Sequence, residues 1–151
     1  MSPPGARHGN LQSRLAVALG SMGETKGHGQ SYTEVGSVLR RNPDHVLGPD
    51  AAFVANRSLP AAISSEGFLE TIPELVVEIR SKNDAKAEIE AKVAEYISAG
   101  VLQVWIVDPA SETIAEHRPN LPPRTLGKGD ALQCEDIIPG FRLELAELFR
   151  E

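Results

Sequence analysis

The sequence predicts an α/β fold in which helices flank a mixed β-sheet. Segments with helical and with extended periodicity alternate along the chain, and a β-branched run over residues 75–80 is followed by a helical stripe and a second apolar run over 101–108. Strand, helix and strand in this order form the crossover that joins two parallel strands. The residues beyond this unit alternate as hairpins do, which adds antiparallel strands, so the sheet is expected to be mixed.

The first half of the chain supplies one helix and several short strands. Apolar residues at helical spacing predict an amphipathic helix over residues 8–22, preceded by a disordered lead-in at residues 1–7. Glycines then end the helix. Short strands are expected over residues 30–35, 36–41 and 51–54, the last of which begins directly after Asp50.

The second half is organised around residues 75–108. After the strand at 75–80, Asn83 or Asp84 can cap a helix that extends over 84–99 and stops at Gly100. Further elements are then expected: a buried strand over 101–108, hairpin strands over 112–117 and 124–126, and a last short helix or turn over 143–149.

The bulk properties are those of a globular protein. The 151 residues, of which 41% are hydrophobic and 24% are charged, suit one domain, expected over residues 8–151. The lone Cys134 rules out an internal disulfide and a cysteine-rich zinc site, and it suits a reducing, cytoplasmic compartment. We expect neither a signal peptide nor a membrane span, because no apolar segment of either kind is present.

The charge balance counts mildly against a nucleic-acid substrate. The net charge is −6, whereas non-specific nucleic-acid binders usually carry a basic patch that neutralises phosphates. Five basic residues either gather after folding or lie scattered over a solvated surface: Arg40, Arg41, Arg57, Arg80 and Lys82. The acidic balance does not count against a metal site, because a carboxylate-rich site itself lowers the net charge.

Glu78 is anomalous because it lies within the most apolar strand of the sequence. Side chains alternate along a strand, so Glu78 shares one face with Val76 and Arg80, opposite Val77 and Ile79. A carboxylate in a buried strand is costly unless it is paired or binds a metal. Two interpretations stay open: Glu78 is a metal ligand, or it pairs with Arg80 on a half-exposed face.

Lys92 lies on the following helix, at the edge of its apolar stripe, three residues after Ile89 and four before Tyr96. This position directs the lysine toward the sheet that carries Glu78. The alternative is a lysine whose stem merely covers apolar surface. Lys86, at the other edge of the stripe, competes for any role assigned to Lys92.

Asp50 follows Pro49 and precedes an apolar strand, so it is either an ordinary turn residue or a second carboxylate for a shared site. Mg²⁺ prefers oxygen ligands, commonly one or two carboxylates completed by water and substrate phosphate. A nearby lysine, protonated beside two carboxylates, can orient the attacking water and offset charge on the phosphate. We therefore predict that Asp50, Glu78 and Lys92 converge on one site for Mg²⁺ or Mn²⁺.

Ordered segments along nearly the whole chain resemble one known family. They are Pro49–Val54, Pro73–Ser81, Lys92–Tyr96, Ala99–Val101 and Val104–Pro109, with His8–Gln12 and Pro139–Leu143 near the two ends. No single segment is specific, but their order and spacing are. The set is similar to the Uma-type restriction endonucleases, which belong to the PD-(D/E)XK nuclease superfamily.

The resemblance implies a restriction-endonuclease-like core that acts on DNA, with Asp50 and Glu78 as metal ligands and Lys92 as the lysine of the site. The classical superfamily motif places its lysine two residues after the acidic residue, on the same strand. That position is Arg80 here, and an arginine stays charged and cannot act as a base. In the Uma-type pattern the lysine lies on the following helix, in a placement similar to Lys92.

Two weaker candidates remain. Glu34 resembles an acidic position of the family, and it is either a third carboxylate or an exposed strand glutamate. His8 either approaches the site from the first helix or is a polar residue at a helix start. The other three histidines, His28, His45 and His117, show no ligand spacing.

Three functional classes are consistent with these residues. The first is a Mg²⁺-dependent endonuclease that hydrolyses DNA, with a two-fold homodimer as the default assembly. The second is a catalytically degenerate nuclease fold that serves as a binding or dimerisation module, which the acidic balance and Arg80 favour. The third is a metal-dependent hydrolase of small phosphate esters. Fold alone does not decide among the three.

Overall fold

A six-stranded mixed sheet forms the centre of the computed structural model, which describes residues 5–151. In spatial order the strands are β1 (Gly29–Thr33), β4 (Ala51–Ala55), β5 (Leu75–Ile79), β6 (Gln103–Asp108), β7 (Thr113–His117) and β8 (Arg124–Leu126). Strands β5 and β6 pair in parallel, and the other neighbours in this sheet pair antiparallel. The predicted α/β class and its mixed sheet are confirmed.

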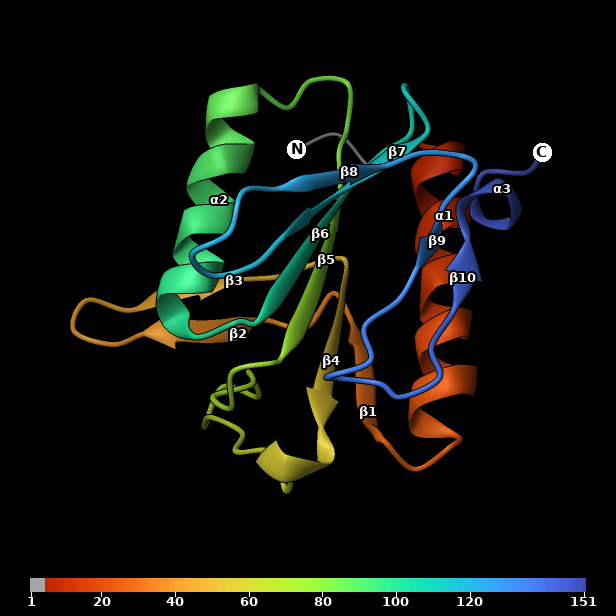
Figure 1. Cartoon of the computed structure of the whole chain (residues 1–151). Coiled ribbons are helices and arrows are strands. Elements are labelled where there is room, and N and C mark those ends of the chain that lie inside the picture. Colours follow the sequence, from red (N-terminus) through yellow and green to blue (C-terminus); the bar gives the residue numbers. More distant parts are fainter. Residues whose placement is uncertain (1–4) are drawn as a thin grey trace.

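Helices cover both faces of the sheet (Figure 1). The crossover helix α2 (Lys86–Ala99) lies on one face and contacts the hairpin of β2 (Ser37–Arg40) and β3 (His45–Leu47). The other face carries α1 (Ala6–Leu19), its π-helical extension η1 (Gly20–Glu24), the strand pair β9 (Ala131–Leu132) and β10 (Leu143–Glu144), and α3 (Leu145–Leu148). A 3-10 turn, η2 (Asn56–Ser58), follows β4. Within residues 5–151, no helix combines the length and the apolar character that crossing a membrane requires.

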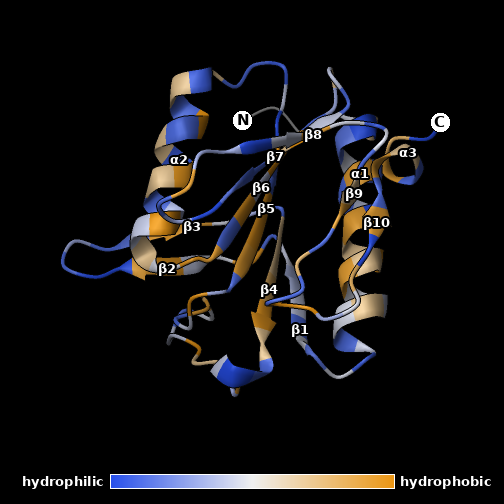
Figure 2. Ribbon diagram, in the orientation of Figure 1, coloured by the Kyte–Doolittle hydropathy of each residue, from blue (hydrophilic) through white to orange (hydrophobic). Residues whose placement is uncertain are grey.

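Each face of the central strands packs into its own apolar core. The odd-numbered residues of β5 belong to the core beneath α1, where the buried Trp105 ring lies 5.7 Å from that of Phe141. Val76 belongs to the core beneath α2. Figure 2 shows hydrophobic colour along the central strands β4 and β5. The alternation inferred from the sequence therefore holds, and it places Glu78 on the α2 face.

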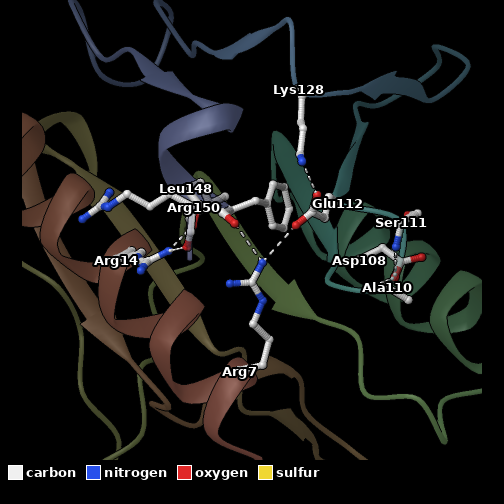
Figure 3. A network of polar contacts seen from close by, with 10 residues as sticks. Arg7, Arg14, Asp108, Ala110, Ser111, Glu112, Lys128, Leu148 and Arg150 are labelled. Carbon is white, nitrogen blue, oxygen red and sulfur yellow. Dashed lines mark hydrogen bonds and ion pairs between the residues drawn. The ribbon is translucent and has the colours of Figure 1, made fainter.

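The first helix begins at Ala6, two residues earlier than predicted. Arg7 donates a hydrogen bond of 3.1 Å to the carbonyl of Phe149 and pairs with Glu112 at 3.2 Å, which fixes the first helical turn against the C-terminal segment (Figure 3). Arg14 adds bonds to the carbonyls of Leu148 and Arg150. The disordered lead-in proposed for residues 1–7 is thus wrong for residues 6 and 7, and residues 1–4 lie outside the described residues.

Other boundaries differ from the prediction where loop contacts decide them. Helix α2 begins at Lys86 after an N-cap residue, Ala85, that has no capping side chain. The predicted cap Asp84 instead accepts a hydrogen bond from the backbone of Ser81 and closes the preceding turn. Strand β6 begins at Gln103, two residues later than expected. The short strands β3 and β9 are not predicted from the sequence, and the segment predicted as a helix or turn over 143–149 opens with β10.

Candidate active site at the ends of β4 and β5

The sheet register brings two of the predicted site residues next to each other. Strands β4 and β5 are antiparallel, and Ala51 pairs with Val77. Asp50 directly precedes Ala51 and Glu78 directly follows Val77, so both residues lie at the same end of this strand pair. The Asp50 carboxylate also acts on Glu78 electrostatically and helps to raise its pKa. The neighbourhood predicted for Asp50 and Glu78 is therefore present in the fold.

The Asp50 side chain is held at the point where three elements meet. Its Oδ2 accepts a hydrogen bond of 2.7 Å from the backbone N–H of Ile79, at the end of β5. Its Oδ1 lies 3.5 Å from Nε2 of His8 on α1. Gln12, one turn along α1, donates a bond of 2.9 Å to the Asp50 carbonyl. Asp50 is therefore fixed by tertiary contacts and is not a free turn residue.

Glu78 is held from the opposite side by α2. Its Oε2 accepts a hydrogen bond of 2.6 Å from the hydroxyl of Tyr96, and its Oε1 lies 3.6 Å from Nζ of Lys92. The Glu78 side chain is only 14% exposed. The alternative in which Glu78 pairs with Arg80 is not the arrangement found.

Burial shapes the electrostatics of both carboxylates. It raises the pKa of Asp50 above its usual range, while the N–H of Ile79 and the nearby His8 act in the opposite direction. It likewise raises the pKa of Glu78, while the Tyr96 hydroxyl and Lys92 oppose the shift. Desolvation disfavours a carboxylate's charged form, so a cation beside these two acids would offset the cost of their charge.

The two candidate lysines occupy different environments. Lys92 points to Glu78, with 49% of its side chain exposed. Lys86 is 85% exposed and lies 3.9 Å from Glu90 on the outer surface of the same helix. The geometry therefore separates Lys86 from the candidate site and places Lys92 in it.

Arg80, at the classical lysine position, is engaged elsewhere. It lies 3.6 Å from Asp108 at the end of β6 and donates a bond of 3.3 Å to the carbonyl of Asp84. It does line a small cleft of about 30 Å³ beside Glu78 and Lys92. A cleft of that size holds about one water molecule or an ion of similar size. Arg80 therefore borders the site, while its ion pair is with Asp108 rather than with Glu78.

The two weaker candidates both approach Asp50. His8 reaches it from α1, which agrees with the first of the two interpretations of this histidine. Strand β1 ends at Thr33, and Glu34 follows in the left-handed backbone region with φ of 51°. Glu34 is exposed, its N–H contacts the Asp50 carbonyl at 3.4 Å, and its carboxylate raises the pKa of Asp50. It is an exposed neighbour of the site.

The donor set suits a hard divalent cation. Asp50 and Glu78 supply two carboxylates from adjacent strands, and each keeps one oxygen that accepts no hydrogen bond from residues 5–151. Mg²⁺ commonly binds one or two carboxylates and completes its shell with water and phosphate. No group of three or more His, Cys, Asp or Glu side chains among the described residues is arranged to hold a metal ion. Asp50 and Glu78 therefore remain the two residues that could hold a metal ion here, and the metal site itself stays a prediction.

The basic residues named from the sequence do not form a patch. Four of them pair with acids in separate parts of the structure: Arg40 with Glu95, Arg41 with Asp44, Arg57 with Glu74 and Arg80 with Asp108. They lie on the β2–β3 hairpin, in η2 and after β5. The scattered, solvated alternative is thus the arrangement found.

Tyr96 and Gln12 are contacts of the site that the sequence analysis missed. Periodicity assigned Tyr96 to the apolar stripe of α2, which is correct for its ring but says nothing of its hydroxyl. A buried tyrosine hydroxyl usually finds a hydrogen-bond partner. The spacing of four residues between Lys92 and Tyr96, which puts both on one helix face, was the available signal.

Comparison with known proteins agrees with this architecture. Among curated proteins no match is found. The crystal structure of a protein from Anabaena variabilis, entitled a "putative nuclease belonging to DUF820", superposes with a TM-score of 0.82 at 17% sequence identity, covering 98% of this chain and 83% of that one. At this identity the likeness establishes the fold. The model of the Uma2 family, described as "Putative restriction endonuclease", matches residues 1–146, and the chain therefore belongs to that family.

Proposed function

We propose that the protein is a Mg²⁺-dependent endonuclease that hydrolyses DNA phosphodiester bonds at Asp50, Glu78 and Lys92. The observation that carries the proposal is the contact of 3.6 Å between Lys92 Nζ and Glu78 Oε1, beside Asp50 on the neighbouring strand. Membership of a family of restriction-endonuclease type supports a nuclease role. A two-fold homodimer, which can place two such sites on the two strands of a duplex, remains part of the proposal.

Each residue has a distinct task in this scheme. Asp50 and Glu78 would hold the cation, which would supply Lewis-acid polarisation of the phosphate and a more acidic water as the nucleophile. The Lys92 ammonium lies 3.6 Å from Glu78 Oε1 on a half-exposed side chain, from where it can position the attacking water and stabilise charge on the phosphate. His8 and the N–H of Ile79 keep the Asp50 carboxylate oriented.

DNA binding is expected to be weak outside the site itself. The net charge is −6, and the named arginines are already paired with acids. Non-specific affinity for DNA comes from cations that replace counterions on the phosphates. Binding should therefore depend mainly on phosphate contacts at the metal centre, and it should fall when the metal is removed.

Plasmid cleavage in Mn²⁺ or Mg²⁺ tests the assignment. We expect the wild type to nick supercoiled DNA, and Glu78→Ala and Lys92→Ala to lose activity by about 100- to 1,000-fold, the cost of one strong electrostatic contact in a transition state. Lys86→Ala is the matched control, because this lysine lies on the same helix but 3.9 Å from Glu90 rather than near Glu78.

Three results would change the proposal. Equal loss in Lys86→Ala would contradict the role of Lys92. A wild-type protein that binds metal but cuts only a chromogenic phosphodiester would indicate a hydrolase of small phosphate esters. A protein that shows no metal binding by calorimetry and no cleavage would indicate a degenerate fold that serves as a binding or dimerisation module.

A further inference from the structure

Helix α2 contacts both oxygens of one carboxylate. The Tyr96 hydroxyl donates a bond of 2.6 Å to Oε2 of Glu78, while Lys92 lies 3.6 Å from Oε1. Residues four apart lie one above the other on a helix face. A single helix face therefore determines both the direction of the Glu78 carboxylate and the position of the cation beside it.

We propose that Tyr96 is a positioning residue, whose hydroxyl fixes Glu78 so that Oε1 is presented to the bound cation and to Lys92. This inference rests on the proposed function, because it concerns how the same site is assembled. Tyr96 acts through Glu78, since its hydroxyl is occupied by Oε2 and its side chain is 0% exposed.

The surroundings of Tyr96 suit a permanent hydrogen-bond donor. A phenolic hydroxyl carries its proton at neutral pH, and that of Tyr96 donates the bond of 2.6 Å to Glu78. The ring packs in the core beneath α2 with Val76, Val93 and Val104, which restricts its rotation. A donor that neither ionises nor moves holds one Glu78 oxygen while the other stays available for the site.

The rival interpretation is that Tyr96 only fills the core. Tyr96→Phe keeps the ring and removes only the hydroxyl, so it separates the two roles. The chain also contains a matched control: Tyr32 lies on β1, and its hydroxyl bonds to Gln30, two residues away. Tyr32→Phe removes the same atom from a tyrosine that does not contact Glu78.

The first test measures metal binding and cleavage separately. We expect Tyr96→Phe to bind Mn²⁺ about 10- to 100-fold more weakly by calorimetry. This is the usual loss when a residue that hydrogen-bonds to a metal ligand is removed. With saturating Mn²⁺, kcat should fall while KM for DNA stays within about twofold of the wild type, because only transition-state contacts are lost. Tyr32→Phe should match the wild type. Unchanged Mn²⁺ affinity and unchanged kcat in a folded Tyr96→Phe protein would overturn the proposal.

A second test needs neither metal nor activity. A hydroxyl proton that is buried and bonded to a carboxylate exchanges slowly, so proton NMR of the metal-free protein should show a downfield resonance. It should persist in Tyr32→Phe and vanish in Tyr96→Phe and Glu78→Ala. If the resonance is unaffected by Glu78→Ala, or if Tyr96→Phe alone cannot fold, Tyr96 belongs to the core and the positioning role is wrong. If the wild type shows the resonance but neither binds Mn²⁺ nor cuts DNA, the proposed function fails, and the role of Tyr96 fails with it. If the wild type binds Mn²⁺ and cuts DNA but lacks the resonance, only the role of Tyr96 is overturned.

Discussion

The two faces of the central sheet differ in what they bury. Beneath α1 the strands contribute apolar side chains, among them Trp105, Val77 and Ile114, all fully buried. Beneath α2 the same strands contribute a smaller apolar cluster. Glu78 lies on this face too, where it is hydrogen-bonded to Tyr96 and close to Lys92. One strand, β5, serves both faces through alternate residues. The α1 face is suited to stability, and the edge of the α2 face is suited to chemistry.

This difference has a physical basis. Apolar burial stabilises a fold without directional contacts, whereas a buried carboxylate costs free energy unless it is paired. Glu78 and Asp50 are partly buried, their pKa values are raised, and hydrogen bonds and nearby basic groups compensate only in part. Loss of side chains from the α1 face should therefore reduce stability, while loss of charge near α2 should reduce metal binding and can increase stability.

The largest effect is expected from Trp105→Ala on the α1 face. Trp105 is fully buried, packs against Phe141 and donates a hydrogen bond to Gln103. Deleting such a side chain lowers the free energy of unfolding by about 3–5 kcal/mol, through lost burial and the cavity that remains. Urea unfolding monitored by circular dichroism measures this change. A loss below 1 kcal/mol would contradict the assignment of the main core to this face.

Asp50→Asn should produce opposite effects on metal binding and on stability. We expect Mn²⁺ affinity to fall by about 100-fold, since one of two anionic ligands is lost. The metal-free variant should melt at a higher temperature at neutral pH, because the asparagine can still accept from Ile79 without a buried charge. Calorimetric titration and thermal melts in EDTA measure the two effects.

The pH dependence of the melts sharpens the same prediction. The pKa values of Asp50 and Glu78 are raised in the folded state. A carboxyl with a raised folded pKa contributes stability below its unfolded pKa and loses that contribution as pH rises through the folded value. These two groups should therefore stabilise the metal-free wild type as pH falls from neutral into the mildly acidic range, and Asp50→Asn should show a flatter profile. A steeper profile in the variant would contradict the buried-acid interpretation.

His8→Ala should have an intermediate effect. His8 Nε2 lies 3.5 Å from Asp50 Oδ1, on the N-terminal turn of α1 that Arg7 anchors (Figure 3). We expect Mn²⁺ affinity or cleavage rate to fall by about tenfold, as for other residues that orient a metal ligand. His28→Ala, in the loop before β1, is the control for loss of a histidine. Equal effects in the two variants would remove His8 from the site.

The smallest effect is expected from Lys86→Ala. Its contact with Glu90 is a solvent-exposed pair four residues apart on α2. Such pairs contribute about 0.3–0.5 kcal/mol, and alanine is itself a good helix former. The melting temperature and the cleavage rate should stay close to those of the wild type. A change above 1 kcal/mol would show that α2 packs differently from the arrangement described here.

Much of the fold followed from local patterns. Alternation over residues 75–79 and helical spacing over residues 86–99 gave the crossover, the inner face of α2 and the direction of Glu78. These features are predictable because side-chain direction within one element depends only on its period. Element boundaries were less predictable: α1 begins at Ala6 because of Arg7, whose partners lie more than 100 residues away in sequence.

The sequence by itself determined the α/β order, the burial of Glu78 within an apolar strand and the inward position of Lys92. Tertiary structure decided which contacts these residues make. It directed Arg80 to Asp108, left Lys86 in solvent, brought His8 to Asp50 and turned the Tyr96 hydroxyl toward Glu78. The reason is that periodicity fixes the face on which a side chain lies, whereas its partner depends on register and packing between elements that are distant in the chain.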